Sequence, residues 1–118
     1  MRHQNGRKKL NLKPAHKRSM LRNQLIFLID YGHVVSTKAC IKELRKFAEK
    51  LVTIAREGNT FNVRRRVNAL LPYKPDSAIK LVKEVAPRYV DRPGGYTRII
   101  PMGKRISDTA EVARLEWV

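Results

Sequence analysis

The first 22 residues contain eight lysines and arginines but no aspartate or glutamate, and the first carboxylate of the chain is Asp30. Such a segment repels itself and has little apolar surface to bury, so it should not fold alone. The asparagines and histidines between the charges can hydrogen-bond to phosphates, sugars and base edges. We therefore expect residues 1–14 to form an extended basic arm that becomes ordered on a polyanion. The alternative is a solvated or localisation tail, and composition alone does not separate RNA from DNA.

The rest of the chain is basic as well. The other 18 of the 26 lysines and arginines face all ten carboxylates, and the net charge of the 118 residues is +16. This charge disfavours a compact chain unless counter-ions or a partner neutralise it. The hydrophobic fraction of 42% permits a modest core. We expect one folded domain over residues 15–118, with a surface suited to nucleic acid.

Several functional classes find no support in the residues. Cys40 is the only cysteine, so a disulfide framework and a thiolate zinc cluster are excluded. The spacing of His3, His16 and His33 matches no metal-ligand motif. The longest apolar run, Leu25–Ile29, is far shorter than the ~20 residues of a membrane helix. With no catalytic constellation visible, we expect no enzyme, no cofactor, no small-molecule substrate and no membrane partner.

The sequence pattern predicts a helix, a short strand, three further helices and then two strands. The second helix is the clearest, because Ile41, Leu44, Ala48 and Leu51 recur at intervals of three and four residues. After Pro87 the period changes to two, which is typical of strands. The expected elements are helices over 16–31, 37–57, 60–71 and 75–86, and strands over 33–36, 96–100 and 112–118. The expected boundary residues are Pro14, Gly32, Ser36 or Thr37 as a cap, Thr60, and Asp76 as a second cap.

Three consecutive arginines, Arg64, Arg65 and Arg66, fall in the third expected helix. They cannot share one helix face, so we expect one of them to pair internally, with Glu57 as the candidate partner. The other two could hold phosphates as bidentate forks. The alternative is an ordinary exposed basic helix face.

The stretch Pro87–Arg98 combines arginines, tyrosines and the pair Gly94-Gly95. Glycine permits a positive φ and a close approach of the backbone to a phosphate. Arginine can pair with phosphates, and Tyr96 could stack on an unpaired base. The alternative is a hairpin turn whose tyrosines belong to the core. The expected contacts in this stretch are Arg88, Arg92, Tyr96 and Arg98.

Two adjacent basic residues, Lys104 and Arg105, fall in an expected loop over Met102–Thr109. Two adjacent cations are a weak signal for binding. We expect Asp108 and Glu111 to balance them.

Taken in order, these residues resemble the bacterial large-subunit ribosomal protein family numbered seventeen. The pieces are individually short, but their order and spacing run along the whole chain. They are Met1-Arg2-His3, Gly6-Arg7, Leu10-Asn11, His16-Lys17-Arg18, Met20–Leu25, Thr37-Lys38-Ala39, Lys42–Arg45, Glu49-Lys50-Leu51, Arg64-Arg65, Pro87-Arg88-Tyr89 and Gly94–Ile99.

The resemblance implies an α+β fold of two layers, with about four helices packed on a small three-stranded mixed sheet and an extended basic N-terminal arm. It also implies a structural role in the cytoplasmic ribosome, with 23S rRNA and neighbouring large-subunit proteins as partners. The alternative is a free basic regulator or nucleoid-type protein. The expected RNA contacts are Arg2, His3, Arg7, Lys8, Lys9, Asn11, Lys13, His16, Lys17, Arg18, Arg22, Asn23, Arg64, Arg65, Arg88, Arg92, Tyr96 and Arg98.

Overall fold

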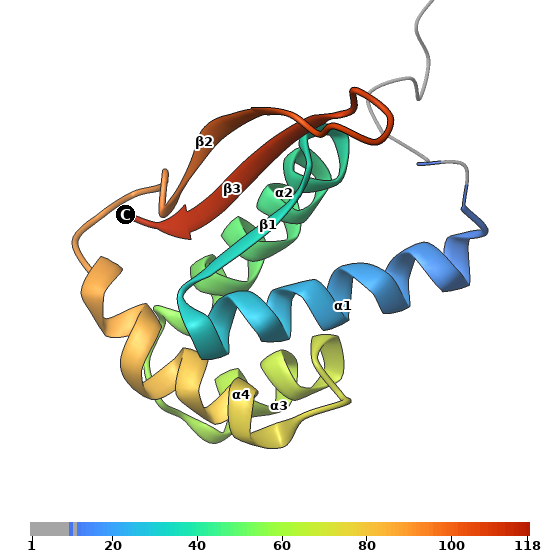
Figure 1. Ribbon diagram of the computed structural model, residues 1–118. Coiled ribbons are helices and arrows are strands. Elements are labelled where there is room, and N and C mark those ends of the chain that lie inside the picture. The colour runs from blue at the N-terminus through green and yellow to red at the C-terminus, as the bar shows by residue number, and fades with distance from the viewer. Residues whose placement is uncertain (1–9, 11) are drawn as a thin grey trace, which may run out of the picture.

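The computed structural model describes residue 10 and residues 12–118 (Figure 1). The expected arm contacts Arg2, His3, Arg7, Lys8, Lys9 and Asn11 lie outside these described residues. Along the chain the elements are α1 (Pro14–Tyr31), β1 (His33–Thr37), α2 (Lys38–Ala55), α3 (Phe61–Leu70), α4 (Pro75–Lys80), the π-helical η1 (Leu81–Val85), the 3-10 helix η2 (Ala86–Tyr89), β2 (Thr97–Lys104) and β3 (Glu111–Trp117).

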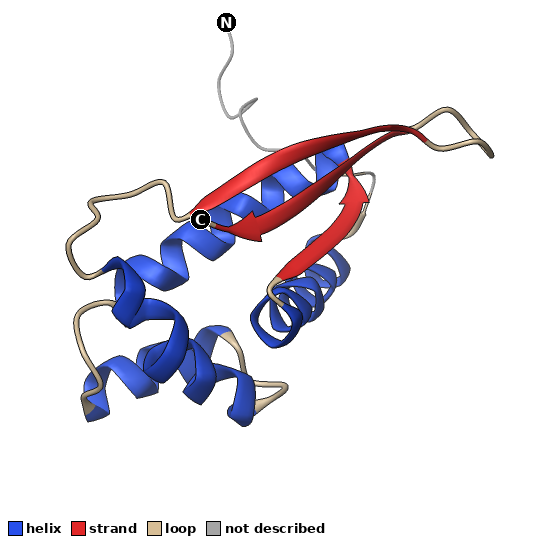
Figure 2. Cartoon of the chain, turned by 60° about the vertical axis from the view of Figure 1, so that its left-hand side comes forward, coloured by secondary structure: helices blue, strands red, loops and turns tan. Residues whose placement is uncertain are grey.

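The three strands form one sheet, and the helices lie on one side of it (Figures 1 and 2). The strand order is β1–β3–β2, and both pairings are antiparallel. The predicted two-layer α+β fold is therefore confirmed. The expectation of a mixed sheet is wrong, because β2 and β3 form a hairpin and β1 also runs opposite to the central strand β3.

Helix α2 supplies the middle of the core. The side chains of Ile41, Leu44, Ala48 and Leu51 are fully buried, at the spacing that predicted the helix. They pack with residues from α1, α3 and β3, among them Leu28, Val67 and Leu115. Thr37 occupies the cap position as expected, but its side chain does not make the expected capping hydrogen bond.

Helix α1 places its fully buried side chains in its second half. Pro14 starts the helix, because its missing N–H would have no partner in the first turn. Gly32 ends it with a φ of 82°, and its N–H bonds to the Leu28 carbonyl at 2.8 Å. The buried residues of α1 are Leu25, Leu28 and Ile29, all in its second half. In the first half Arg18 is exposed, whereas Lys17 and Arg22 are partly buried.

Helix α3 was expected to begin at Thr60, and Thr60 instead caps it, since its hydroxyl accepts a hydrogen bond from the Val63 N–H at 3.3 Å. Asp76 lies in the first turn of α4 and does not cap it, because Lys74 precedes the helix. The fourth helix was expected to end before Pro87. Instead the chain stays helical through η1 and η2, since Pro87 falls in the first turn of η2, where no intrahelical N–H is needed.

Strand β2 continues past its expected end at Ile100 and reaches Lys104. Pro101 is tolerated because β2 is an edge strand that needs no ladder N–H on its outer side. The pairing register with β3 shifts between Pro101 and Gly103. Lys104 thus lies in the ladder opposite Glu111, and the expected loop over Met102–Thr109 is shortened.

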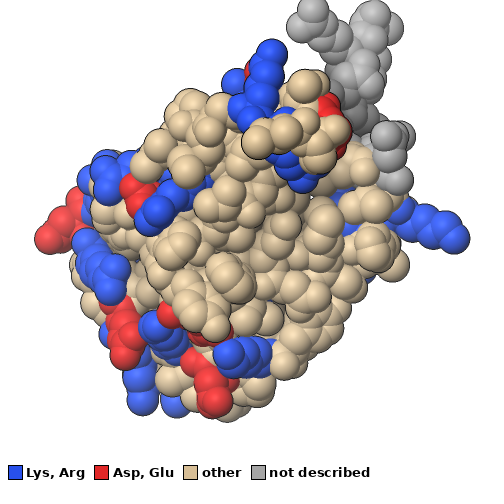
Figure 3. Space-filling view, viewed as in Figure 1, with Lys and Arg blue, Asp and Glu red and all other residues tan. Residues whose placement is uncertain are grey.

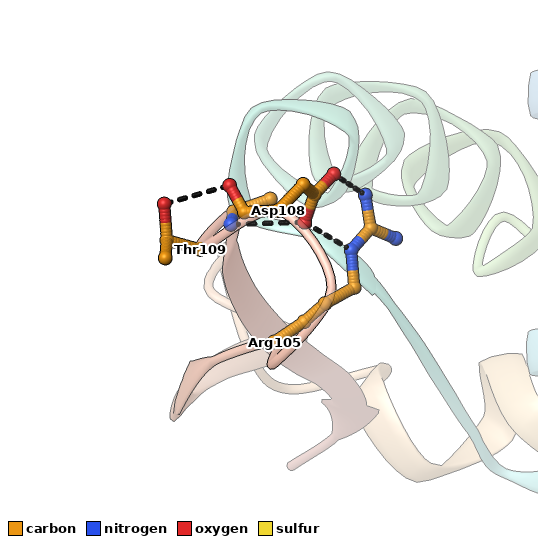
Figure 4. A network of polar contacts seen from close by, with 4 residues as sticks. Arg105, Asp108 and Thr109 are labelled. Atoms are coloured by element: carbon orange, nitrogen blue, oxygen red, sulfur yellow. Dashed lines mark hydrogen bonds and ion pairs between the residues drawn. The ribbon is translucent and has the colours of Figure 1, made fainter.

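The turn of this hairpin is held by one carboxylate (Figure 4). Asp108 accepts hydrogen bonds from Arg105 Nε at 2.8 Å and Nη2 at 2.7 Å, and from the Ala110 N–H at 3.1 Å. The hydrogen bond from Arg105 is the main reason why the pKa of Asp108 falls to about 2. Asp108 therefore balances Arg105 as expected, whereas Glu111 pairs with Lys38 at 3.6 Å.

Replacing Arg105 by alanine should raise the pKa of Asp108 from about 2 toward the ordinary 3.8, because the main hydrogen-bond donor is lost. The carboxyl carbon shift of Asp108, followed by NMR from pH 6 to pH 1.5, measures this. Since a lowered pKa stabilises the ionised folded form, order in the turn of the wild type should persist at pH 4 and be lost as the pH falls toward 2. A titration midpoint of Asp108 that the substitution leaves unchanged would contradict the role of Arg105 in lowering its pKa.

Candidate nucleic-acid interface

Six of the expected contacts lie at Lys13, which precedes α1, and along α1 between His16 and Asn23. Lys13, His16, Arg18 and Asn23 are exposed, whereas Lys17 and Arg22 are partly buried. The Arg22 guanidinium lies over the Tyr73 ring, 5.7 Å from its centroid. Hydrogen bonds with Ser19 and then Arg22 lower the pKa of the Tyr73 hydroxyl. The first half of α1 is thus tied to the α3–α4 connection while most of its polar side chains remain accessible.

A groove of about 390 Å³ separates α1 from α2. Its carboxylate, Glu43, is only 7% exposed and lies 3.5 Å from Lys17 Nζ and 3.0 Å from Lys46 Nζ. Because these two cations neutralise Glu43, the groove presents a positive rim to solvent. The lining residues are Arg18, Leu21, Glu43, Lys46, Phe47 and Lys50.

The outer face of α2 is the part of the surface that sequence reasoning missed. Lys42, Arg45 and Lys50 are exposed, and no carboxylate of the described residues forms an ion pair with them. Lys42, Lys46 and Lys50 recur every four residues, a spacing that would have placed them on one side of the helix. We call Lys42, Arg45, Lys46 and Lys50 the α2 basic face.

A second groove, of about 620 Å³, extends the α2 basic face toward the start of β2. It is lined by Lys42, Arg45, Lys46, Glu49, Gly95 and Ile99. Lys46 lines both grooves, so cations run continuously from Arg18 on α1 across α2 to Gly95. Figure 3 shows that on another face the lysines and arginines gather around the rim, which leaves the centre uncharged.

Of the three α3 arginines, one forms an internal ion pair and two are exposed, as predicted. Arg66 Nη1 lies 3.0 Å from Glu57 Oε2, which confirms the expected internal pair. Arg64 and Arg65 are exposed, whereas Val63 and Val67, on the other side of the helix, are buried in the core. Neither groove beside α2 includes these arginines, so they form a separate basic patch.

Tyr96 is a core residue, and the prediction that it stacks on a base is wrong. Its side chain is 1% exposed, its ring packs on Tyr89 with centroids 5.3 Å apart, and its hydroxyl lies 3.2 Å from Arg56 Nη1. A ring buried on all sides has no face for a base. The alternative of a turn with core tyrosines is the one observed.

The backbone after the two glycines is also engaged. Glu49 of α2 accepts the N–H groups of Tyr96 at 3.2 Å and Thr97 at 3.3 Å, and the Thr97 hydroxyl at 3.0 Å. Gly95 has a φ of 63°, which turns the chain so that these groups converge on one carboxylate. The amides that could have cradled a phosphate thus fix β2 to α2.

The other three expected contacts of the stretch Pro87–Arg98 are arginines, and they lie on the surface. Arg88 and Arg92 are exposed, and Arg92 Nε donates to the Gly94 carbonyl at 3.2 Å. Arg98 points from the helix-free face of the sheet, where its Nε lies 2.8 Å from Glu116 Oε1. Arg114 also reaches Glu116, at 3.2 Å. Arg98 is therefore an ion-paired side chain, away from the α2 basic face.

Other kinds of site were sought among the described residues. They include no group of three histidine, cysteine or carboxylate side chains that could hold a metal ion. Over the same residues, no helix has the length and apolar character needed to cross a bilayer. Cys40 is buried and donates to the Gln24 side-chain oxygen at 3.0 Å, in keeping with a small core residue.

The fold and surface define a class: small, strongly basic α+β proteins in which most carboxylates are engaged by cations or amides of the same chain. The family model described as "Ribosomal protein L17" matches residues 20–118. The chain belongs to this family of ribosomal proteins.

Relatives with the name "Large ribosomal subunit protein bL17" agree with this. The Sulfurovum sp. protein is 44% identical over 118 residues, covering 100% of both chains. The Campylobacter lari protein is 44% identical and covers 100% of this chain and 99% of its own. The Desulforudis audaxviator protein is 43% identical over 113 residues, covering 96% and 99%.

Removing the carboxylate of Glu49 should destabilise the fold. Glu49→Ala leaves two partly buried N–H groups and a hydroxyl without an acceptor, so the free energy of unfolding should fall by about 2 kcal/mol or more. Urea unfolding followed by circular dichroism measures this. Glu84→Ala is the matched control, because Glu84 is exposed, and its effect should stay within about 0.5 kcal/mol. Equal midpoints for the two variants would contradict the anchoring role.

Proposed function

We propose that this protein is a structural constituent of the large ribosomal subunit in the cytoplasm that binds 23S rRNA and stabilises its folding and assembly. The observation that carries the proposal is the outward charge of α2. Its two carboxylates are turned inward, to Lys17, Lys46 and the start of β2, while its cations line two open grooves. Family membership supports the ribosomal setting, and no observation favours a free regulator.

Electrostatics favours a polyanionic partner. Most carboxylates of the chain already hold a cation or a backbone amide, so they do not offset the exposed lysines and arginines. RNA phosphates supply the missing negative charge, and their binding releases condensed counter-ions. The engaged carboxylates are Asp30, Glu43, Glu49, Glu57, Asp108, Glu111 and Glu116.

The proposed RNA surface joins the arm, the first half of α1 and the α2 basic face. Arg64 and Arg65 form a second contact region, and Arg88 and Arg92 a third. For Arg98 to contact RNA, its guanidinium must exchange Glu116 for a phosphate. Tyr96 is not part of the proposed RNA surface, because it is buried. The first region comprises Arg2, His3, Arg7, Lys8, Lys9, Asn11, Lys13, His16, Lys17, Arg18, Arg22, Asn23, Lys42, Arg45, Lys46 and Lys50. Neighbouring large-subunit proteins complete its surroundings.

The salt dependence of RNA binding tests the proposal. Each phosphate contact contributes about 0.7 to 0.9 to the slope of log affinity against log salt. Removing two cations of the α2 basic face, in Arg45→Ala/Lys50→Ala, should therefore flatten the slope by about 1.4 to 1.8. Filter binding of the purified protein to large-subunit rRNA between 50 and 400 mM salt measures it.

The control is Lys83→Ala/Lys104→Ala, which removes the same charge from exposed positions on η1 and at the end of β2. Its slope should match that of the wild type. If both double variants flatten the slope equally, binding depends on net charge and the α2 basic face is not the interface. Sedimentation of a cell lysate, with the protein migrating in the large-subunit peak at moderate salt, tests the ribosomal assignment separately.

A further inference from the structure

A third groove, of about 510 Å³, lies between α1 and the outer side of β1. It is lined by Asn23, Gln24, Phe27, His33, Val34 and Val35. Phe27 is 47% exposed and Val35 is 48% exposed. Tyr31, one helical turn beyond Phe27, is 65% exposed, and the two rings lie 4.5 Å apart. Apolar surface is thus concentrated beside one edge of the sheet.

This groove differs in charge from the two beside α2. No lysine, arginine, aspartate or glutamate is among the described residues that line it, although such residues make up 31% of the chain. Figure 3, which has β1 and α1 toward the viewer as in Figure 1, shows an uncharged centre on this face. RNA binding needs cations opposite its phosphates, so the groove as a whole does not suit RNA, although one of its lining residues, Asn23, also belongs to the proposed RNA surface.

The two edges of the sheet are protected unequally. β2 carries Pro101, a register shift before Gly103, and the charged side chains of Arg98 and Lys104, all features that hinder pairing with a further strand. β1 reads His-Val-Val-Ser-Thr and has no proline, no charged residue and no register shift against β3. Its other side pairs with no strand in the described part of the chain.

An open strand edge beside an apolar groove is the arrangement used in β-strand addition, in which an extended segment pairs with the edge and alternate side chains fill the groove. A second copy of this chain does not fit, because two molecules of charge +16 repel each other. We infer that β1 and the groove receive an extended, apolar segment of a neighbouring protein as a fourth strand. This inference rests on the proposed function, which supplies the neighbour.

The first test places a benzophenone amino acid at position 35 of the full chain in cells and irradiates purified large subunits. The same probe at position 100 is the matched control, because Val35 and Ile100 both lie opposite Arg114 in one cross-strand row. We expect a cross-link from position 35 to one other protein of the subunit, at least tenfold stronger than from position 100. Cross-links to rRNA, to a second copy or within the chain, or no cross-link, would overturn the inference.

The second test compares Val35→Lys with Ile100→Lys, which add the same charge beside Arg114 on opposite edges. Lysine on an edge strand hinders strand pairing. In competition with wild type, incorporation of Val35→Lys into large subunits should fall about tenfold, and that of Ile100→Lys should change less than twofold. Equal incorporation would overturn the inference.

Purified Val35→Lys and Ile100→Lys should melt alike and show the wild-type salt slope for RNA, so a loss of incorporation reports on the edge and not on folding or RNA binding. Failure of the proposed function appears elsewhere, as a salt slope insensitive to Arg45→Ala/Lys50→Ala. The two failures are therefore distinguishable.

Discussion

The fold depends on α2, because the sheet, α1 and α3 all pack on it and its two carboxylates fix the elements on either side. Its apolar stripe forms the middle of the core. Glu43 reaches Lys17 of α1, and Glu49 collects the first amides of β2. A carboxylate that accepts several N–H groups holds its partners more firmly than an exposed ion pair does. The polar side of α2 therefore sets where α1 and the hairpin lie, as much as its apolar side does.

Carboxylates elsewhere in the molecule also hold distant segments together. Asp30, at the end of α1, accepts from Lys74 Nζ at 2.6 Å and Ser77 Oγ at 2.8 Å, which joins α1 to α4. Burial tends to raise the pKa of Asp30, but these hydrogen bonds and the charges of Lys74 and Lys80 lower it below its usual value. The contacts of Asp30 and the pair of Lys17 with Glu43 connect segments distant in sequence and place a carboxylate beside cations of the fold. The cations left over lie on the surface, where a polyanion can reach them.

The sequence predicted what depends on local pattern and missed what depends on contacts between distant segments. The periodic burial of Ile41, Leu44 and Leu51 and the ion pair of Arg66 follow from spacing along a helix. The burial of Tyr96 does not follow from local spacing. It depends on Glu49, 47 residues earlier, which accepts the Tyr96 N–H and so holds the start of β2 against α2. The α2 basic face was overlooked for a related reason: Glu43 and Glu49 stand among its lysines in the sequence, and only the fold shows that both carboxylates have partners on other elements.

The charged and uncharged grooves also follow from one feature of the topology. β1 sits at an edge because the hairpin of β2 and β3 places its second strand in the centre, so the outer side of β1 faces α1. Along α1, Arg18 and Leu21 face α2 and Phe27 faces β1, because side chains three or four positions apart share a face and those between do not. One helix therefore borders two surfaces of different chemistry. A protein held between RNA and another protein needs such a division, since phosphates and an apolar strand cannot be bound by the same side chains.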